Sequence, residues 1–358
     1  MISGENTGER LPKISIALFG RNDNYGGDFI EKLSFSIKSI QRALKDIDYE
    51  IVLLDYNPPK DKPLLSECFP IKDFPRVKHV VFSHEDHLEF IDCHLRAGAK
   101  LLKNSIYNHK REMSVNKIKA INFLGAGAAA ILSVKNCTGD YILSTGTDNI
   151  FPKQFGDFVD KLEPNILYRT IIWKMKEEFK EIRKILFSQF DNMSVDNKLL
   201  SKNYFKKYGI NFKIKKTIWS SAGNFLLMDK NSWKEVGGYL PTINPRPPMG
   251  DCQVVFHALI RGKKVKYVGF PIFNICYPLG EQYKGFNIDS NYIVRKNKIE
   301  YNHRTEIMQK RWRKFRKWAK KSYLEPEKEY FIKIKYKKRL EEIKQLFKSF
   351  LPEKFLLN

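Results

Sequence analysis

The sequence predicts an α/β fold with a doubly wound, mostly parallel β-sheet. Short apolar segments that end in polar or Gly-rich loops predict buried strands. Segments with apolar residues at helical spacing lie between them, and short loops connect the two kinds of segment, as in sheets with helices on both faces. Apolar residues make up 42% of the 358 residues and include 26 Phe and 17 Tyr, which excludes a disordered chain.

A strand, a helix and a second strand open the chain. Residues Ile14–Phe19 are apolar except for one serine and lead into a polar, Gly-rich loop that ends at Gly27. Apolar side chains then recur at helical spacing over residues 29–44, which predicts a helix. Tyr49–Asp55 is the second predicted strand, because the turn residues Asn57–Pro59 stop it.

Two more strands and a helix complete the first half of the chain. Val77–Phe82 is the third predicted strand. An Ala- and Gly-rich stretch over residues 116–134 predicts a helix, and Asp140–Leu143 predicts the fourth strand. Pro152 is expected to precede a new helix.

The second half carries fewer signals. Residues 168–216 are Lys-rich and predict no definite element. Asn224–Met228 predicts a strand, residues 251–261 predict a helix, and Lys264–Val268 predicts a last strand.

A short helix is expected directly after the strand that ends at Met228. Asp229 is a typical N-cap residue, and the helix should run through Val236 and end at two glycines. Trp233 lies within this helix, and we expect it to pack in the core rather than to bind a substrate.

Length and charge indicate a main domain with a basic appendage. The chain exceeds the about 250–300 residues at which one core stops growing, so we expect a domain over residues 1–290 and a helical tail over residues 291–358. From Arg295 onward, 21 Lys and Arg stand against 8 Asp and Glu, so this part carries +13 of the net charge of +24. Such a charge implies an anionic partner: nucleotide phosphates, a lipid surface or a nucleic acid.

Cysteine and histidine positions predict no metal site. The five cysteines are scattered and odd in number, which predicts buried thiols in a reducing compartment. Four histidines are close in sequence but fit no standard zinc spacing, so we expect surface or loop positions for His79, His84, His87 and His94. Residues 1–12 are polar and predict no secretion signal, and no apolar run of about 18 residues predicts a membrane span.

The segment Gly139–Pro152, GDYILSTGTDNIFP, is the most informative one. Asp148 and Asn149 follow the fourth strand, and ligands of open α/β sheets bind outside the carboxyl ends of strands. A carboxylate beside an amide can hold Mg²⁺ or Mn²⁺ bound to phosphate oxygens. A plain Asp-Asn turn after a strand explains the same residues.

Four segments together resemble the nucleotide-sugar-dependent glycosyltransferases of the GT-A fold, most closely the family 2 type. They are ISIALFGRND, EIVLLDYNPP, GDYILSTGTDNIFP and GNFLLMDKNSWKEVGGY, and the resemblance covers residues 14–277. The third lies where that family has its Asp-x-Asp motif, and the spacing of the fourth is the most specific match. Residues 21–27, RNDNYGG, resemble the opening loop of a family-2-like variant that lacks a full Asp-x-Asp.

The resemblance implies a nucleotide-diphosphate sugar donor, a divalent metal (Mn²⁺ or Mg²⁺) and a nucleotide-binding half over residues 13–150, followed by an acceptor half over residues 151–290. It implies nucleotide-sugar contacts from Phe19, Arg21, Asn22, Asp55, Thr147 and Asp148, metal contacts from Asp148 and Asn149, and acceptor-side positions for Trp219, Gly223 and Asn224. The first acid of the metal motif is replaced by Gly146, so Asp148 is its only carboxylate. Asn274 and Tyr277 stand near the position where many members have a histidine ligand.

Asp251 is the candidate base for an inverting transfer. It follows the loop Pro247–Gly250 at the start of a predicted helix, and an acid at this place deprotonates the acceptor in the enzymes that the chain resembles. An N-cap aspartate fits the same sequence equally well.

The basic tail has three open interpretations. Met308, Trp312, Phe315 and Ala319 recur at helical spacing among Lys and Arg residues. Such a helix suits an anionic membrane surface or a lipid-linked acceptor, packing on the main domain, or, as the least favoured partner, nucleic acid.

The leading interpretation is a metal-assisted, inverting glycosyltransferase that acts on a glycan or lipid-linked acceptor in the cytoplasm, at the inner membrane face in one version. A binding protein or inactive relative is the second interpretation, because the metal motif lacks its first acid. A nucleic-acid-binding α/β protein is the third, although the sequence has no recognisable motif of that class.

Overall fold

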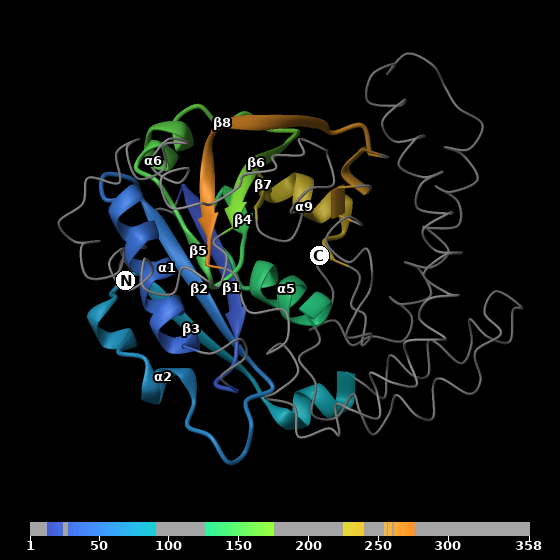
Figure 1. The fold of residues 1–358 in the computed structure, drawn as a ribbon. Helices are drawn as coiled ribbons and strands as arrows, with labels where there is room; N and C mark the ends of the chain where they lie inside the picture. The colour runs from blue at the N-terminus through green and yellow to red at the C-terminus, as the bar shows by residue number, and fades with distance from the viewer. Residues whose placement is uncertain are drawn as a thin grey trace, which may run out of the picture.

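The computed structural model describes residues 13–23, 28–90, 126–174, 225–239, 254–255, 257–259 and 261–275. They form a mixed eight-stranded sheet in the order β3-β2-β1-β4-β7-β6-β8-β5, with helices on both faces (Figure 1). Four of the seven strand pairings are parallel. The α/β fold class with a mostly parallel sheet is therefore confirmed, whereas the predicted basic tail lies outside the described residues.

The first half of the sheet is entirely parallel. Its strands are β1 (Ile14–Gly20), β2 (Tyr49–Tyr56), β3 (Val77–Phe82) and β4 (Tyr141–Ser144). β1 lies between β2 and β4, and β3 pairs with the outer edge of β2. All four carboxyl ends consequently meet at one edge of the sheet.

Antiparallel pairings join the second half to the first. β7 (Leu226–Asp229) runs antiparallel to β4 on one side and to β6 (Ile166–Lys174) on the other. β8 (Lys264–Asn274) is parallel to β6, and the two-residue strand β5 (Asn149–Ile150) pairs with the end of β8. The residues on both sides of position 150 thus share one sheet, and the predicted division into two halves stays a prediction.

Two hydrophobic cores cover the two faces of the sheet. On one face, α1 (Phe29–Ala43) and α6 (Gln154–Val159) pack with the short α2 (Leu65–Cys68). On the other face lie α5 (Ala126–Lys135) and α9 (Lys230–Val236), and residues 254–255 and 257–259 are also helical there. Figure 1 shows α1 and α6 to one side of the strands and α5 and α9 to the other.

Strand alternation assigns each side chain of β2 to one of these cores. Val52, Leu54 and Tyr56 belong to the core under α5, whereas Ile51 and Leu53 belong to the core under α1. Asp55 follows the same period and faces α2.

Several predicted elements appear with nearly the same bounds, and two do not. The strand at residues 77–82 and the helix capped by Asp229 are confirmed. β6 overlaps the beginning of the Lys-rich stretch for which no element was predicted, because Arg169 interrupts its apolar residues. β8 extends six residues past the predicted end at Val268 and through Pro271.

Histidine and cysteine positions correct part of the sequence prediction. His87 is 1% exposed, so the expected surface position is wrong for it, and His79 lies on β3. Both contact neighbouring side chains of β2, His87 the Tyr56 hydroxyl and His79 the Asp55 carboxylate. Cys137 is buried as predicted, and Cys68 is half-buried.

At the edge of the sheet opposite the carboxyl ends, the carboxylate of Glu50 connects three strands. Glu50 Oε1 accepts hydrogen bonds from Ser15 Oγ at 2.5 Å, from Thr138 N at 2.5 Å and from Thr138 Oγ1 at 2.8 Å. Ser15 Oγ also accepts from Gly139 N at 2.7 Å. These bonds connect the beginnings of β1, β2 and β4.

Asp229 caps α9 and also fixes the start of β6. Its Oδ1 accepts from Ser232 N at 2.8 Å, and its Oδ2 accepts from Ser232 Oγ at 2.6 Å and from Asn165 N at 2.8 Å. Trp233 in the same helix is 0% exposed and donates from Nε1 to Ile142 O at 2.8 Å, which confirms its predicted place in the core.

Replacing Asp229 by Ala should lower the free energy of unfolding by about 1–2 kcal/mol, because the cap and the bond to Asn165 are both lost. Urea denaturation followed by circular dichroism measures this. Asp229→Ser is the matched control, since serine retains a capping oxygen and should recover part of the loss. Equal stability of Asp229→Ala and the unchanged chain would contradict the capping role.

No helix among the described residues has the length and apolar character needed to cross a bilayer.

Candidate functional site

The strand order reverses between β1 and β4, and this creates the place where α/β sheets bind ligands. From β1 the chain proceeds outward to β2 and β3, and then returns to place β4 on the other side of β1. Ligands of open α/β sheets bind outside the carboxyl ends of the strands at such a switch point. Ala17 pairs with Ser144, so Arg21 and Asp148 each lie four residues past a paired position at this switch point.

Arg21 forms the polar end of β1. It is buried, and its Nε donates to Asp23 Oδ2 at 2.6 Å while Nη1 donates to the carbonyl of Asn57 at 3.4 Å. Asn22 Nδ2 donates to Pro63 O at 3.1 Å. Phe19 packs partly buried against the core under α5. The loop after β1 is thus tied to the loop after β2.

Asn57 connects the ends of β2 and β3. Its backbone adopts a left-handed conformation with φ of 49°, which asparagine tolerates better than most residues. Its N–H donates to Phe82 O at 2.7 Å, and its Oδ1 lies 2.9 Å from His84 Nδ1. A continuous polar network therefore runs from Asp23 through Arg21 and Asn57 to His84.

Tyr56 and His87 form a buried pair behind this network. The Tyr56 hydroxyl lies 2.9 Å from His87 Nδ1, and its ring stacks on Phe82. Burial raises the pKa of Tyr56 well above its usual value, and the positive charge of Arg21 opposes this only in part. Tyr56 is consequently a neutral hydroxyl at physiological pH.

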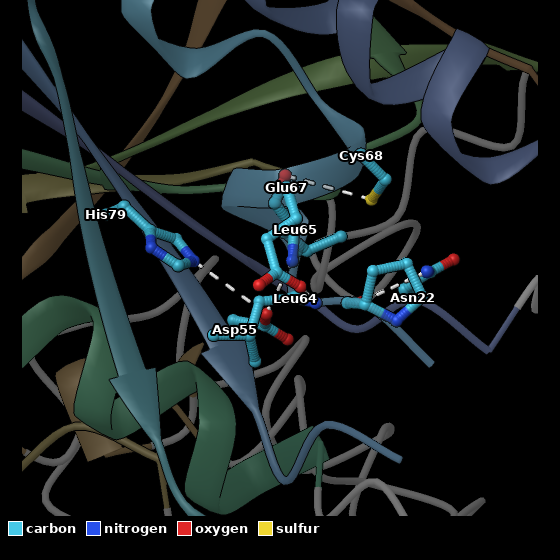
Figure 2. Close-up of polar contacts among 8 residues, drawn as sticks. Asn22, Asp55, Leu64, Leu65, Glu67, Cys68 and His79 are labelled. Carbon is cyan, nitrogen blue, oxygen red and sulfur yellow. Dashed lines mark hydrogen bonds and ion pairs between the residues drawn. The ribbon is translucent and has the colours of Figure 1, made fainter. Parts of the chain in front are cut away.

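Asp55 lies below the edge rather than on it. It is 0% exposed, and its Oδ2 accepts from Leu65 N at 2.8 Å, so it holds the beginning of α2 (Figure 2). His79 Nε2 on β3 lies 3.7 Å from the same oxygen. Within the described part of the chain, Asp55 Oδ1 and His79 Nε2 have no hydrogen-bond partner. Unsatisfied buried groups of this kind are rare, and a catalytic or ligand-binding role is one of the explanations for them.

Asp148 and Asn149 follow β4 with different surroundings. Thr147 is buried, and Asp148 is 8% exposed and accepts at its backbone oxygen from Ile275 N at 2.9 Å. Asn149 is 0% exposed, its Nδ2 donates to Thr145 Oγ1 at 2.9 Å, and its Oδ1 accepts from Asn274 Nδ2 at 2.8 Å.

The structure brings part of the predicted site together. Arg21, Asn22, Thr147 and Asp148 lie on the loops that follow β1 and β4, and Asp55 lies at the adjoining end of β2. The predictions for Asp251, Trp219, Gly223 and Asn224 concern residues outside the described part of the chain.

Sequence reasoning missed Asn57 and His84 as members of the edge network. Asn57 was used only as a strand stop; asparagine tolerates the left-handed conformation that it adopts here, but the proline that follows it favours an extended one, so its sequence context provides no clear signal. For His84 the sequence carries no signal, because the contact depends on the pairing of β2 with β3.

A divalent cation fits this edge only together with a ligand that brings its own oxygens. The described residues contain no cluster of three or more His, Cys, Asp or Glu that could hold a metal ion. Mg²⁺ and Mn²⁺ commonly bind through one or two carboxylates plus substrate phosphates, and Asp148 can supply such an oxygen.

No protein-family model and no curated protein matches the chain. Several solved structures resemble it at low identity. The crystal structure of GalNAc-T7 with UDP, GalNAc and Mn²⁺ is 13% identical, with a TM-score of 0.41; the match covers 75% of this chain and 44% of that one. S. aureus TarS 1–349 is 9% identical, with a TM-score of 0.41; the match covers 79% of this chain and 65% of that one.

Mannosyl-3-phosphoglycerate synthase from Rubrobacter xylanophilus is 11% identical, with a TM-score of 0.34; the match covers 81% of this chain and 75% of that one. The match thus spans less than half of the GalNAc-T7 chain and just under two thirds of the TarS 1–349 chain. At these identities and TM-scores, the functional argument rests on the residues of the site.

Proposed function

We propose that this chain is a GT-A fold glycosyltransferase that moves a sugar from a nucleotide-diphosphate sugar to a glycan or lipid-linked acceptor. The observation that carries the proposal is the reversal of strand order between β1 and β4, with a guanidinium on one side and a carboxylate on the other. Ligands of α/β sheets bind at such a point. A diphosphate requires positive charge, and an Arg fork or a carboxylate-bound cation provides it.

The diphosphate would lie between Arg21 and Asp148. The guanidinium of Arg21 matches phosphate oxygens, and its ion pair with Asp23 fixes its direction. Asp148, with the phosphate oxygens, would hold Mn²⁺ or Mg²⁺, which supplies Lewis-acid stabilisation of the leaving diphosphate when it is bound. Thr147 would contact the donor beside Asp148.

The nucleoside would lie over the ends of β1 and β2. Phe19 and Asn22 border this region, and Asp55 offers a carboxylate oxygen that has no hydrogen-bond partner in the described part of the chain. Because Asp55 is covered by the beginning of α2, its contact with a nucleoside requires residues 64–65 to move aside.

The acceptor side is assigned from the resemblance. Trp219, Gly223 and Asn224 would border the sugar and acceptor, and Asp251 would take the proton from the acceptor hydroxyl as the sugar inverts. Cytoplasmic location and docking of the basic tail on an anionic membrane surface stay predictions.

A catalytically weak or inactive relative that only binds nucleotide sugars is the second candidate function. It is favoured by one observation, the presence of a single carboxylate in the metal motif. Turnover, rather than binding, separates it from the first.

A nucleotide-sugar panel tests the proposed function with the full-length chain. We expect a UDP- or GDP-sugar, but not a CMP-sugar, which has a single phosphate, to raise the melting temperature in the presence of Mn²⁺, since a ligand at 100 times its Kd stabilises by about 2.7 kcal/mol. Slow hydrolysis of the same sugar would indicate catalysis. Unchanged melting with every sugar, with and without Mn²⁺, would contradict the proposal.

A further inference from the structure

We propose that Asn149 and Asn274 form an amide clamp that positions Asp148, and that the Asn149 amide is not a metal ligand. Asn149 was predicted from sequence to share the cation with Asp148, and Asn274 stands near a family ligand position. The inference rests on the proposed function, because the cation that Asp148 would hold belongs to it.

The clamp joins the loop after β4 to the end of β8. Asn149 and Asn274 are directly opposed in the antiparallel pair β5–β8, and Asn274 Nδ2 donates to Asn149 Oδ1 at 2.8 Å. Asn149 Nδ2 then donates to Thr145 Oγ1 at 2.9 Å. Asn149 is 0% exposed and Asn274 is also buried, so little water competes for these bonds.

Two contacts hold the backbone of this loop, one at Asp148 and one at Phe151. Ile275 N donates to the carbonyl oxygen of Asp148 at 2.9 Å. Phe151 N donates to Ser39 Oγ at 3.0 Å, and Ser39 Oγ itself donates to Ser36 O at 2.7 Å within α1. The loop is therefore fastened to β8 and to α1, and the peptide of Asp148 has little freedom to change its position.

The geometry also explains why the clamp is made of amides. The Asn149 amide uses its nitrogen for Thr145 and its oxygen for Asn274, so it is directed into the protein interior. A carboxylate at either position would bury a second negative charge beside Asp148, which would favour the protonated form of both acids. Neutral amides fix the loop and leave Asp148 as the single charged ligand.

The test uses Asn149→Ala, Asn274→Ala and the double variant of the full-length chain, with Mn²⁺ plus UDP or GDP as the probe. Calorimetry gives the Mn²⁺ dependence of nucleotide binding. We expect each single variant to bind Mn²⁺ about 10–100-fold more weakly, as the loss of a ligand-orienting partner does. The double variant should lose no more than either single one, because the two amides act as one unit.

Ser15→Ala is the matched control. Ser15 is also a fully buried hydrogen-bonding residue, but it lies at the opposite edge of the sheet. It should lower the melting temperature comparably without changing the Mn²⁺ dependence. If Ser15→Ala and Asn149→Ala weaken Mn²⁺ binding equally, the effect comes from general destabilisation and the proposed clamp is wrong.

Asn149→Asp separates the clamp from direct ligation. A ligand role predicts equal or tighter Mn²⁺ binding, because a carboxylate is a better ligand than an amide. The clamp predicts weaker binding, so tighter Mn²⁺ binding by Asn149→Asp overturns it.

Hydrogen exchange makes the test independent of the proposed function. If the unchanged chain binds no nucleotide with Mn²⁺, the proposed function fails, and exchange at residues 145–151 then decides the clamp. Faster exchange there in Asn149→Ala and Asn274→Ala than in Ser15→Ala supports the clamp, and equal exchange in all three refutes it.

Discussion

Replacing Asp148 by Asn should abolish most Mn²⁺-dependent binding of the nucleotide-sugar donor. Asp148 is the only carboxylate of its motif and lies past the carboxyl end of β4, where the strand order reverses. The loss of this ligand should exceed the 10–100-fold that changes to ligand-orienting residues cost. Titration of Mn²⁺ against the donor that stabilises the unchanged chain measures it.

Asp140→Asn is the matched control for this prediction. Asp140 is an exposed aspartate directly before the same strand, β4, at the opposite end from Asp148. It undergoes the same chemical change and should leave Mn²⁺ binding unaltered. Full activity of Asp148→Asn with an unchanged Mn²⁺ requirement would show that the metal is held elsewhere.

Replacing Asp251 by Asn should lower the rate of transfer by about 10²–10⁴-fold and leave donor affinity nearly unchanged, if the carboxylate is the general base. An amide cannot accept the proton of the acceptor hydroxyl, although it occupies the same volume. Single-turnover kinetics with saturating donor measures this loss.

Asp251→Ser distinguishes the base from the helix cap. Serine is a good N-cap residue but a poor base, so the base role predicts a stable and nearly inactive variant. A cap role predicts that serine retains both stability and activity. Normal turnover of Asp251→Ser would therefore exclude Asp251 as the base.

The features of this fold that depend on neighbouring residues could be predicted from the sequence. Asp229, Trp233 and Gly237 define a cap, an apolar contact and a left-handed helix end within nine residues, and all three appear as expected. Such features depend on neighbours in the chain, which a single sequence displays. β6 was missed because its pattern is broken by Arg169, which is buried within the sheet.

The site was less predictable because its contacts cross the sheet. That Asp148 follows a strand could be read from sequence, but the bond between Asn149 and Asn274 depends on the pairing of β5 with β8, far apart in the chain. Asp55 was recognised as a strand-end acid, whereas its contacts with Leu65 and His79 follow from the position of α2 and the register of β3.

The position of β7 between β4 and β6 has a consequence for the order in which the protein is made. During synthesis, β1 to β4 leave the ribosome long before Leu226–Asp229, so one side of β4 has no partner until late. Closure by a distant segment slows folding and leaves a strand edge open to other chains. The nascent amino-terminal half is therefore the state most exposed to aggregation, and the arrival of β7 ends that exposure.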